Sequence, residues 1–161
     1  MSNVLVTYFS ASGVTAGLAK KLAKAANADL FEIAAAEPYT KADLNWMDKN
    51  SRSSLEMKDA NARPAIKSRI DSLEQYDTVF VGFPIWWYRE PSIIDTFMES
   101  YDFSGKTVIP FATSGSSGLG DTAKNLQALA PGAKVENGRR FSASVSEKEL
   151  KRWVDSFAEM V

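Results

Sequence analysis

The segment Ser10-Ala11-Ser12-Gly13-Val14-Thr15 carries residue types that suit an anion-binding site. It follows an apolar run that predicts a strand ending at Phe9, and it precedes an amphipathic pattern that predicts a helix over Val14 to Ala26. Amides at a helix start point at an anion, the three hydroxyls of the segment can donate hydrogen bonds, and its glycine lets a ligand approach the backbone closely. The segment contains no Lys or Arg, so it differs from a Walker A loop, and it lacks the glycine spacing of dinucleotide folds. A monophosphate is the expected ligand, and the alternative is a Ser-rich turn that only caps the helix.

Two further loops follow predicted buried strands. The first, Phe83 to Pro91, contains three consecutive aromatic residues, and the second, Ala112 to Asp121, is rich in Ser and Gly. Open parallel sheets bind ligands at the carboxyl ends of their strands, beside the point where strand order reverses. We therefore expect both loops to face the phosphate-binding segment, with the second loop able to lie close against a planar ring.

The composition limits the chemistry that side chains can perform. The chain of 161 residues contains neither Cys nor His, which excludes disulfides, thiolate metal sites, thiol nucleophiles and imidazole bases. Any redox or transfer chemistry therefore belongs to a bound cofactor, although a hydrolase that uses only carboxylates stays possible. Lys and Arg number 19 against 20 for Asp and Glu, which predicts neither nucleic acid nor an anionic membrane as a partner.

Strand and helix patterns alternate along the chain and predict an α/β protein. Short apolar runs predict buried strands at Val4 to Phe9, Leu30 to Ala34, Thr78 to Phe83 and Thr107 to Ala112, with a weaker fifth around Val135 to Phe141. Between them, apolar spacing predicts helices over Val14 to Ala26, Ile66 to Leu73, Ile94 to Tyr101 and Leu119 to Ala130. Pro64 and Pro91 stand where prolines start helices. This alternation favours a five-stranded, doubly wound parallel sheet in a three-layer α/β/α sandwich.

The two remaining segments have distinct characters. Ser146 and Glu149 form a capping box before a strongly amphipathic helix that is expected to continue to Val161. Residues 37–63 are polar, rich in turn residues and too long for a plain connection, so we expect an insertion between the second and third strands. No linker or repeat divides residues 1–161, which predicts a single domain. No apolar stretch suits a signal peptide or a membrane span, which favours a cytoplasmic protein.

Taken together, these loops resemble those of the flavodoxin family. The similarity involves the Ser-x-Ser-Gly-x-Thr segment, Gly82 to Tyr88 and Thr113 to Gly120, and it extends to Asp43 to Trp46 and Tyr101 to Lys106, as in a bacterial flavodoxin subgroup. The resemblance implies the strand order 2-1-3-4-5, noncovalent FMN, flavin N5 as the reactive atom, no catalytic side chain and no metal. By the same resemblance, the phosphate is held by Ser10, Ser12, Gly13, Val14 and Thr15. The ring lies between Pro84, Ile85, Trp86, Trp87 and Tyr88 on one side and Thr113, Ser114, Gly115, Ser116, Ser117, Gly118 and Gly120 on the other.

The chain departs from a typical flavodoxin in three respects. The loop after the fourth strand has no aromatic residue, so one ring face is open or is covered by Tyr39 or Trp46 of the insertion. The loop Ile85 to Glu90 has no glycine, which disfavours the peptide flip that supports one-electron chemistry in the family. The net charge of −1 gives weak steering toward a basic partner.

These features favour an FMN-binding electron-transfer protein, monomeric or homodimeric, that exchanges electrons with a redox partner protein or a small quinone-like substrate. The alternative within the fold is an NAD(P)H-dependent FMN quinone reductase or related flavin reductase, and a phosphate-ligand binding module is a third, non-redox class. Arg89, Glu90, Asp95 and Asp121 fall near the expected flavin edge and can orient a substrate. Charges at helix starts more commonly face solvent or complement the helix dipole, which is the ordinary interpretation of these four.

Overall fold

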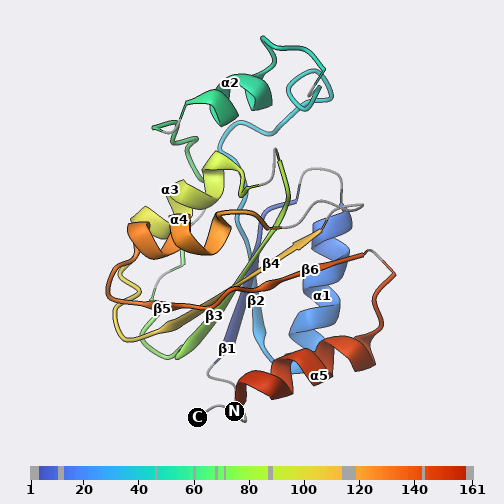
Figure 1. The fold of residues 1–161 in the computed structure, drawn as a ribbon, viewed down its shortest axis with the longest axis vertical. Coiled ribbons are helices and arrows are strands. Elements are labelled where there is room, and N and C mark those ends of the chain that lie inside the picture. The colour runs from blue at the N-terminus through green and yellow to red at the C-terminus, as the bar shows by residue number, and fades with distance from the viewer. Residues whose placement is uncertain are drawn as a thin grey trace.

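The computed structural model describes residues 4–10, 13–45, 47–59, 61–67, 69–70, 72–86, 89–113, 119–142 and 144–158. Its centre is a parallel sheet (Figure 1) made of β1 (Val4–Tyr8), β2 (Asp29–Glu32), β3 (Thr78–Pro84), β4 (Thr107–Thr113), β5 (Lys134–Val135) and β6 (Arg139–Phe141). The strand order is β2-β1-β3-β4-β5, and β6 also pairs with β4. The expected order 2-1-3-4-5 is confirmed.

The single fifth strand of the prediction is instead two short strands. Val108 O accepts a hydrogen bond from Glu136 N at 2.9 Å, but Pro110, two residues further along the same edge of β4, has no N–H to continue the ladder. Pairing resumes where Phe111 faces Arg139. Between the two strands, Gly138 has φ of +72°, and a Cβ there would lie 2.1 Å from Pro110 O. The proline in β4 therefore accounts for the break.

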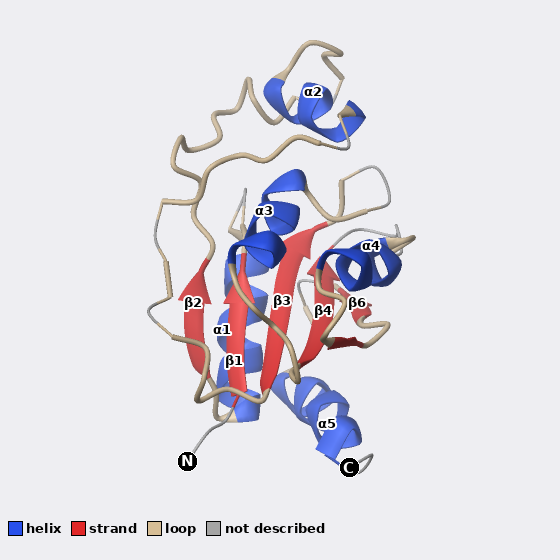
Figure 2. Ribbon diagram, turned by 90° about the vertical axis from the view of Figure 1, so that its left-hand side faces the viewer, coloured by secondary structure: helices blue, strands red, loops and turns tan. Residues whose placement is uncertain are grey.

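Helices cover both faces of the sheet (Figure 2): α1 (Val14–Ala26) and α5 (Glu147–Ala158) on one face, α3 (Ser92–Ser100) and α4 (Thr122–Leu129) on the other. The side chains of β3 alternate between the two resulting cores. Val79 and Val81 pack with the α3 and α4 side, whereas Phe80 packs with the α1 and α5 side. The predicted three-layer α/β/α sandwich is thus present.

The Ser146 half of the predicted capping box of α5 is present, because Ser146 Oγ accepts a hydrogen bond from Glu149 N at 3.1 Å. The helix predicted over Ile66 to Leu73 is wrong for the described residues. There the chain pairs with the segment after β2 through hydrogen bonds from Lys67 N to Ala34 O and from Ala36 N to Ala65 O, at 2.7 and 2.8 Å. Its apolar side chains still pack on the α3 side of the sheet. The apolar spacing therefore reflects burial of these side chains and not a helix.

Part of the expected insertion folds as α2 (Arg52–Lys58), which the sequence did not predict as a helix. Ser51 caps it by accepting a hydrogen bond from Ser54 N at 3.3 Å. Figures 1 and 2 place α2 beyond the end of the sheet toward which the β3 arrow points. The insertion therefore stands over the carboxyl edge, where the sequence predicts the ligand.

Candidate functional site

Three of the predicted ligand segments meet at the carboxyl ends of the neighbouring strands β1, β3 and β4. Thr15, at the start of α1, and Thr113, the last residue of β4, are buried and share a hydrogen bond of 2.8 Å between their hydroxyls. Ile85 N, just after β3, donates to Thr113 O at 3.1 Å. Residues that lie 98 positions apart in the chain thus fix the three loops to one another.

The α1 start has the backbone expected of an anion-binding loop. Gly13 is the N-cap residue with φ of 92°, a left-handed conformation that favours glycine, and the first turn of α1 contains no acidic residue. Ser10 Oγ accepts hydrogen bonds from Gly13 N at 3.0 Å and Ala16 N at 3.2 Å, so its oxygen caps the helix while its O–H is left to donate. Val14 is exposed, and Ser12 lies outside the described residues.

The aromatic loop after β3 is a tight hairpin. Trp86 and Arg89 exchange two backbone hydrogen bonds, each of 3.1 Å. Trp87 and Tyr88, which the sequence also predicts against the ring, lie outside the described residues. The half-buried Trp86 ring meets the Phe9 ring edge-on, with centroids 5.8 Å apart. Pro84 and Ile85 are also half-buried. The hairpin is thus anchored to the end of β1 as well as to β4.

The loop after β4 is described only at its two ends. Thr113 is 6% exposed, Gly120 is exposed with φ of 56°, and Asp121 is the N-cap residue of α4. Residues 114–118, predicted to lie against the ring, fall outside the described residues. Thr113, at the first of these ends, lies beside the start of the hairpin after β3 through its bond with Ile85 N.

Tyr39 of the insertion lies beside the hairpin, where the sequence suggested that it covers the flavin. Its ring contacts the rings of Trp86 and Phe9 with centroids 5.6 and 5.5 Å away, and the Arg52 guanidinium lies 3.9 Å from its centre. Its hydroxyl donates to Glu56 at 2.5 Å, and burial together with this bond raises the pKa of Tyr39. Tyr39 therefore anchors α2 to the site. Trp46, the other candidate, lies outside the described residues.

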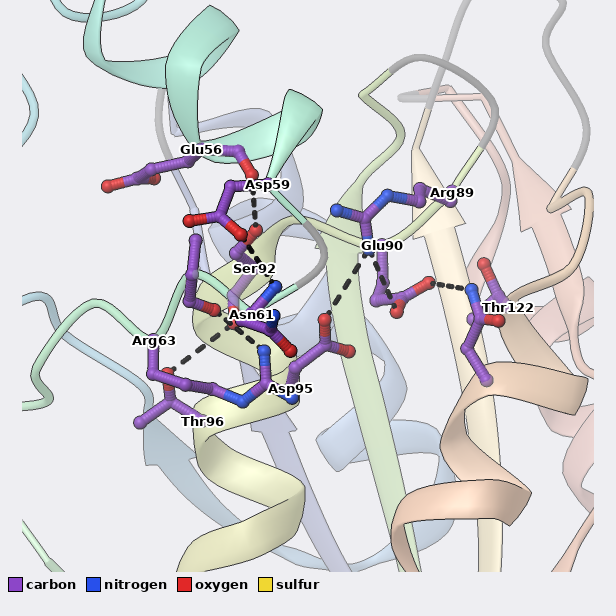
Figure 3. A network of polar contacts seen from close by, with 12 residues as sticks. Glu56, Asp59, Asn61, Arg63, Arg89, Glu90, Ser92, Asp95, Thr96 and Thr122 are labelled. Atoms are coloured by element: carbon purple, nitrogen blue, oxygen red, sulfur yellow. Dashed lines mark hydrogen bonds and ion pairs between the residues drawn. The ribbon is translucent and has the colours of Figure 1, made fainter.

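A buried charged cluster adjoins the base of the hairpin (Figure 3) and overturns the solvated interpretation of two acidic residues. Glu90 is 0% exposed and Asp95, in the first turn of α3, is 4% exposed. Arg89 Nη1 lies 3.5 Å from Glu90 Oε2 and 3.4 Å from Asp95 Oδ2, and Asn125 of α4 donates to Glu90 Oε1 at 3.2 Å. We call these four residues the acid cluster. No sequence pattern signalled that the two carboxyl groups would be buried together.

The acid cluster lines a cavity of about 440 Å³ between α2, α3 and α4. The opposite wall comes from the end of α2 and the segment after it, including Lys58 and Arg63, and Asp121 completes the rim. Across the described ranges, no three acidic side chains are grouped so as to hold a metal ion. None of the helices in those ranges is long and apolar enough to cross a membrane.

The fold and the meeting loops define an α/β protein whose ligand site lies at the carboxyl ends of parallel strands. A family model described as Flavodoxin matches residues 3–157. The chain belongs to the flavodoxin family. A search among curated proteins finds no match to it.

Solved structures agree with this membership. A candidate flavoprotein from Bacteroides uniformis ATCC 8492 is 51% identical with a TM-score of 0.90, and the match covers 96% of this chain and 98% of that one. Another from Bacteroides eggerthii DSM 20697 is 49% identical with a TM-score of 0.91, over 98% and 99% of the two chains. A flavoprotein from Lactobacillus acidophilus NCFM, solved in complex with FMN, shares the fold at 22% identity and a TM-score of 0.69, over 95% and 99%.

Proposed function

We propose that this protein binds FMN noncovalently and transfers electrons. The observation that carries the proposal is the junction of the α1 start, the hairpin after β3 and the end of β4, joined through Thr15, Thr113 and Ile85. This junction brings a phosphate-type helix start next to a half-buried aromatic loop. The FMN complex of the Lactobacillus acidophilus protein of the same fold supports the choice of cofactor.

The described residues fit such a ligand. The left-handed Gly13 and the hydroxyls of Ser10 and Thr15 suit the phosphate, and no acidic side chain in the first turn opposes it. Trp86, Ile85 and Pro84 offer an apolar wall for a ring. FMN, when bound, supplies the redox chemistry that the side chains lack. The chain's own residues bind it, orient it and exclude water from it.

The second candidate is an NAD(P)H-dependent quinone reductase or related flavin reductase. The hairpin has no glycine, and a cavity of about 440 Å³ adjoins its base, which gives room for a small substrate. The electron-transfer proposal has a redox partner protein as its partner, and the reductase proposal has a quinone-like molecule. In both, the protein works in the cytoplasm as a monomer or homodimer.

Anaerobic reduction of the FMN-loaded protein, followed by its visible spectrum, tests the proposal. Stepwise reduction through a long-lived one-electron species supports an electron carrier, whereas direct bleaching by NADPH with turnover of a quinone supports the reductase. A protein that is colourless when purified and takes up no FMN overturns both. For variants of the phosphate side such as Thr15→Val, Thr7→Val is a suitable control. The Thr7 hydroxyl is also buried, but it lies in β1 and donates to Phe80 O at 2.8 Å within the sheet.

A further inference from the structure

The acid cluster holds more negative charge than its arginine can neutralise. One guanidinium nitrogen, Arg89 Nη1, serves both carboxyl groups at 3.4 and 3.5 Å, and the Arg89 side chain is itself 22% exposed. Two ionised carboxylates in one buried space repel each other and lose their hydration. The lower-energy arrangement leaves one carboxyl group neutral.

One carboxylate oxygen of the acid cluster lacks a hydrogen-bond donor, which indicates where a carboxyl proton would be placed. Asp95 Oδ1 is buried and has no hydrogen-bond partner among the described residues. A buried acceptor without a donor is costly, and a neutral Glu90 carboxyl group provides an O–H donor. Burial, followed by hydrogen bonding and charge repulsion from Asp95, raises the pKa of Glu90 from 4.5 to about 8, against a smaller lowering by Asn125.

The charged groups on the other elements around the cavity do not replace this hydrogen. Lys58 is exposed, and Arg63 forms its ion pair with Glu99 at 2.5 Å and acts on Asp95 only through its charge, as a weaker contribution. Asp121, at the start of α4, is exposed and adds a further negative charge at the rim. Arg89 is therefore the cation within ion-pair distance of the two buried carboxyl groups in the described part of the chain.

We propose that Glu90 and Asp95 together bind one proton, and that this proton locks the hairpin after β3 against α3 and α4. Arg89 closes the hairpin through its two backbone bonds with Trp86, and Glu90 joins it to Asn125 of α4. Loss of the proton places a second negative charge beside Asp95 and pushes the hairpin base away from α3. The chain has no His, so this pair gives it a proton-binding group that responds near neutral pH.

The lock affects both loops that are expected to hold the flavin ring, since one ends at Arg89 and the other leads into α4. This consequence rests on the function proposed above, whereas the proton site does not. Glu90→Gln is the informative variant, because a Gln amide donates to Asp95 and accepts from Asn125 as a neutral Glu does. It mimics the protonated state at every pH.

The proton site is tested by carboxyl ¹³C NMR of the whole protein over a pH titration, with the Glu90 signal assigned by its absence in Glu90→Gln. We expect a midpoint near pH 8 and a downward shift of that midpoint in Asp95→Asn. Asp121→Asn, on the same cavity but exposed, leaves the midpoint in place. A Glu90 midpoint near its ordinary value of 4.5, or one that ignores Asp95→Asn, overturns the shared proton.

The lock is tested by the FMN dissociation constant of the wild type and of Glu90→Gln from about pH 6 to about pH 10. We expect the wild type to lose on the order of tenfold in affinity relative to Glu90→Gln as the proton leaves. If the FMN dissociation constants of the two proteins change in parallel with pH although Glu90 titrates near pH 8, the lock is overturned. If neither protein binds FMN, the proposed function fails, and the NMR titration alone then decides the proton site.

Discussion

The two sides of the candidate site handle charge in opposite ways. The phosphate side, formed by Ser10, Gly13 and Thr15, is built from hydroxyls and backbone amides with no charged side chain in the loop. The acid cluster on the other side sets two buried carboxyl groups against one half-buried guanidinium. The uncharged donors of the phosphate side stay available to an anionic ligand, whereas the charged groups of the acid cluster interact with one another and hold loops together. The predictions that follow test this division, from the largest effect to the smallest.

The largest expected effect is a pH-dependent gap in stability between the wild type and Glu90→Gln. The folded state raises the pKa of Glu90 above its unfolded value, so it retains a proton that the unfolded chain releases. The contribution of the Glu90 proton to the free energy of unfolding is full below about pH 4.5 and is lost as pH rises toward about 8. Above that pH it changes no further. Denaturant unfolding should show Glu90→Gln gaining up to about 5 kcal/mol on the wild type over this range. A constant gap contradicts the prediction.

Truncation of the same side chain should destabilise the protein at neutral pH. Glu90→Ala leaves Asn125 and Asp95 without their buried partner, and we expect a loss of about 3 kcal/mol in the free energy of unfolding. Glu90→Gln keeps both hydrogen bonds and should be no less stable than the wild type at neutral pH. If both variants lose equally, the cluster stabilises through the Glu90 charge rather than through its hydrogen bonds.

On the phosphate side, Gly13→Val should weaken FMN by about fiftyfold, because a β-branched residue resists φ of 92°. A Cβ at this position meets nothing within 4 Å, so the effect comes from the backbone and not from a clash. Riboflavin, which lacks the phosphate, provides the comparison in the same fluorescence titration. Equal losses for FMN and riboflavin mean that the loop does not hold the phosphate.

The smallest expected effect is that of Thr15→Val, which removes the bond to Thr113 and costs about 1 kcal/mol of stability. It should also weaken FMN more than riboflavin. Thr7→Val deletes a buried hydroxyl of the same kind in the middle of the sheet, so it should lower stability by a similar amount while leaving the FMN dissociation constant unchanged. An equal change in FMN binding for both variants points to a general loss of stability.

What the sequence reveals depends on whether a signal is local. Neighbouring residues carry the alternation of Val79, Phe80 and Val81 and the cap at Ser146. Such local patterns are enough to predict the strands and α5. Ile66 also shows a helical spacing, but its segment pairs with the chain after β2, a contact that no local pattern contains. The burial of Glu90 is of this second kind. An Arg-Glu-Pro turn is ordinarily solvated, and only the packing of α3 and α4 against it removes the water.

The proline in β4 also bears on how the molecule behaves in a crowded solution. An exposed sheet edge with a long row of unpaired N–H and C=O groups invites a strand from another chain to add to it. Here the edge next to β4 consists of a two-residue strand and a three-residue strand, separated by the bend at Gly138. A foreign strand finds no continuous register along this edge. Pro110 thereby makes one side of the sheet a poor template for aggregation.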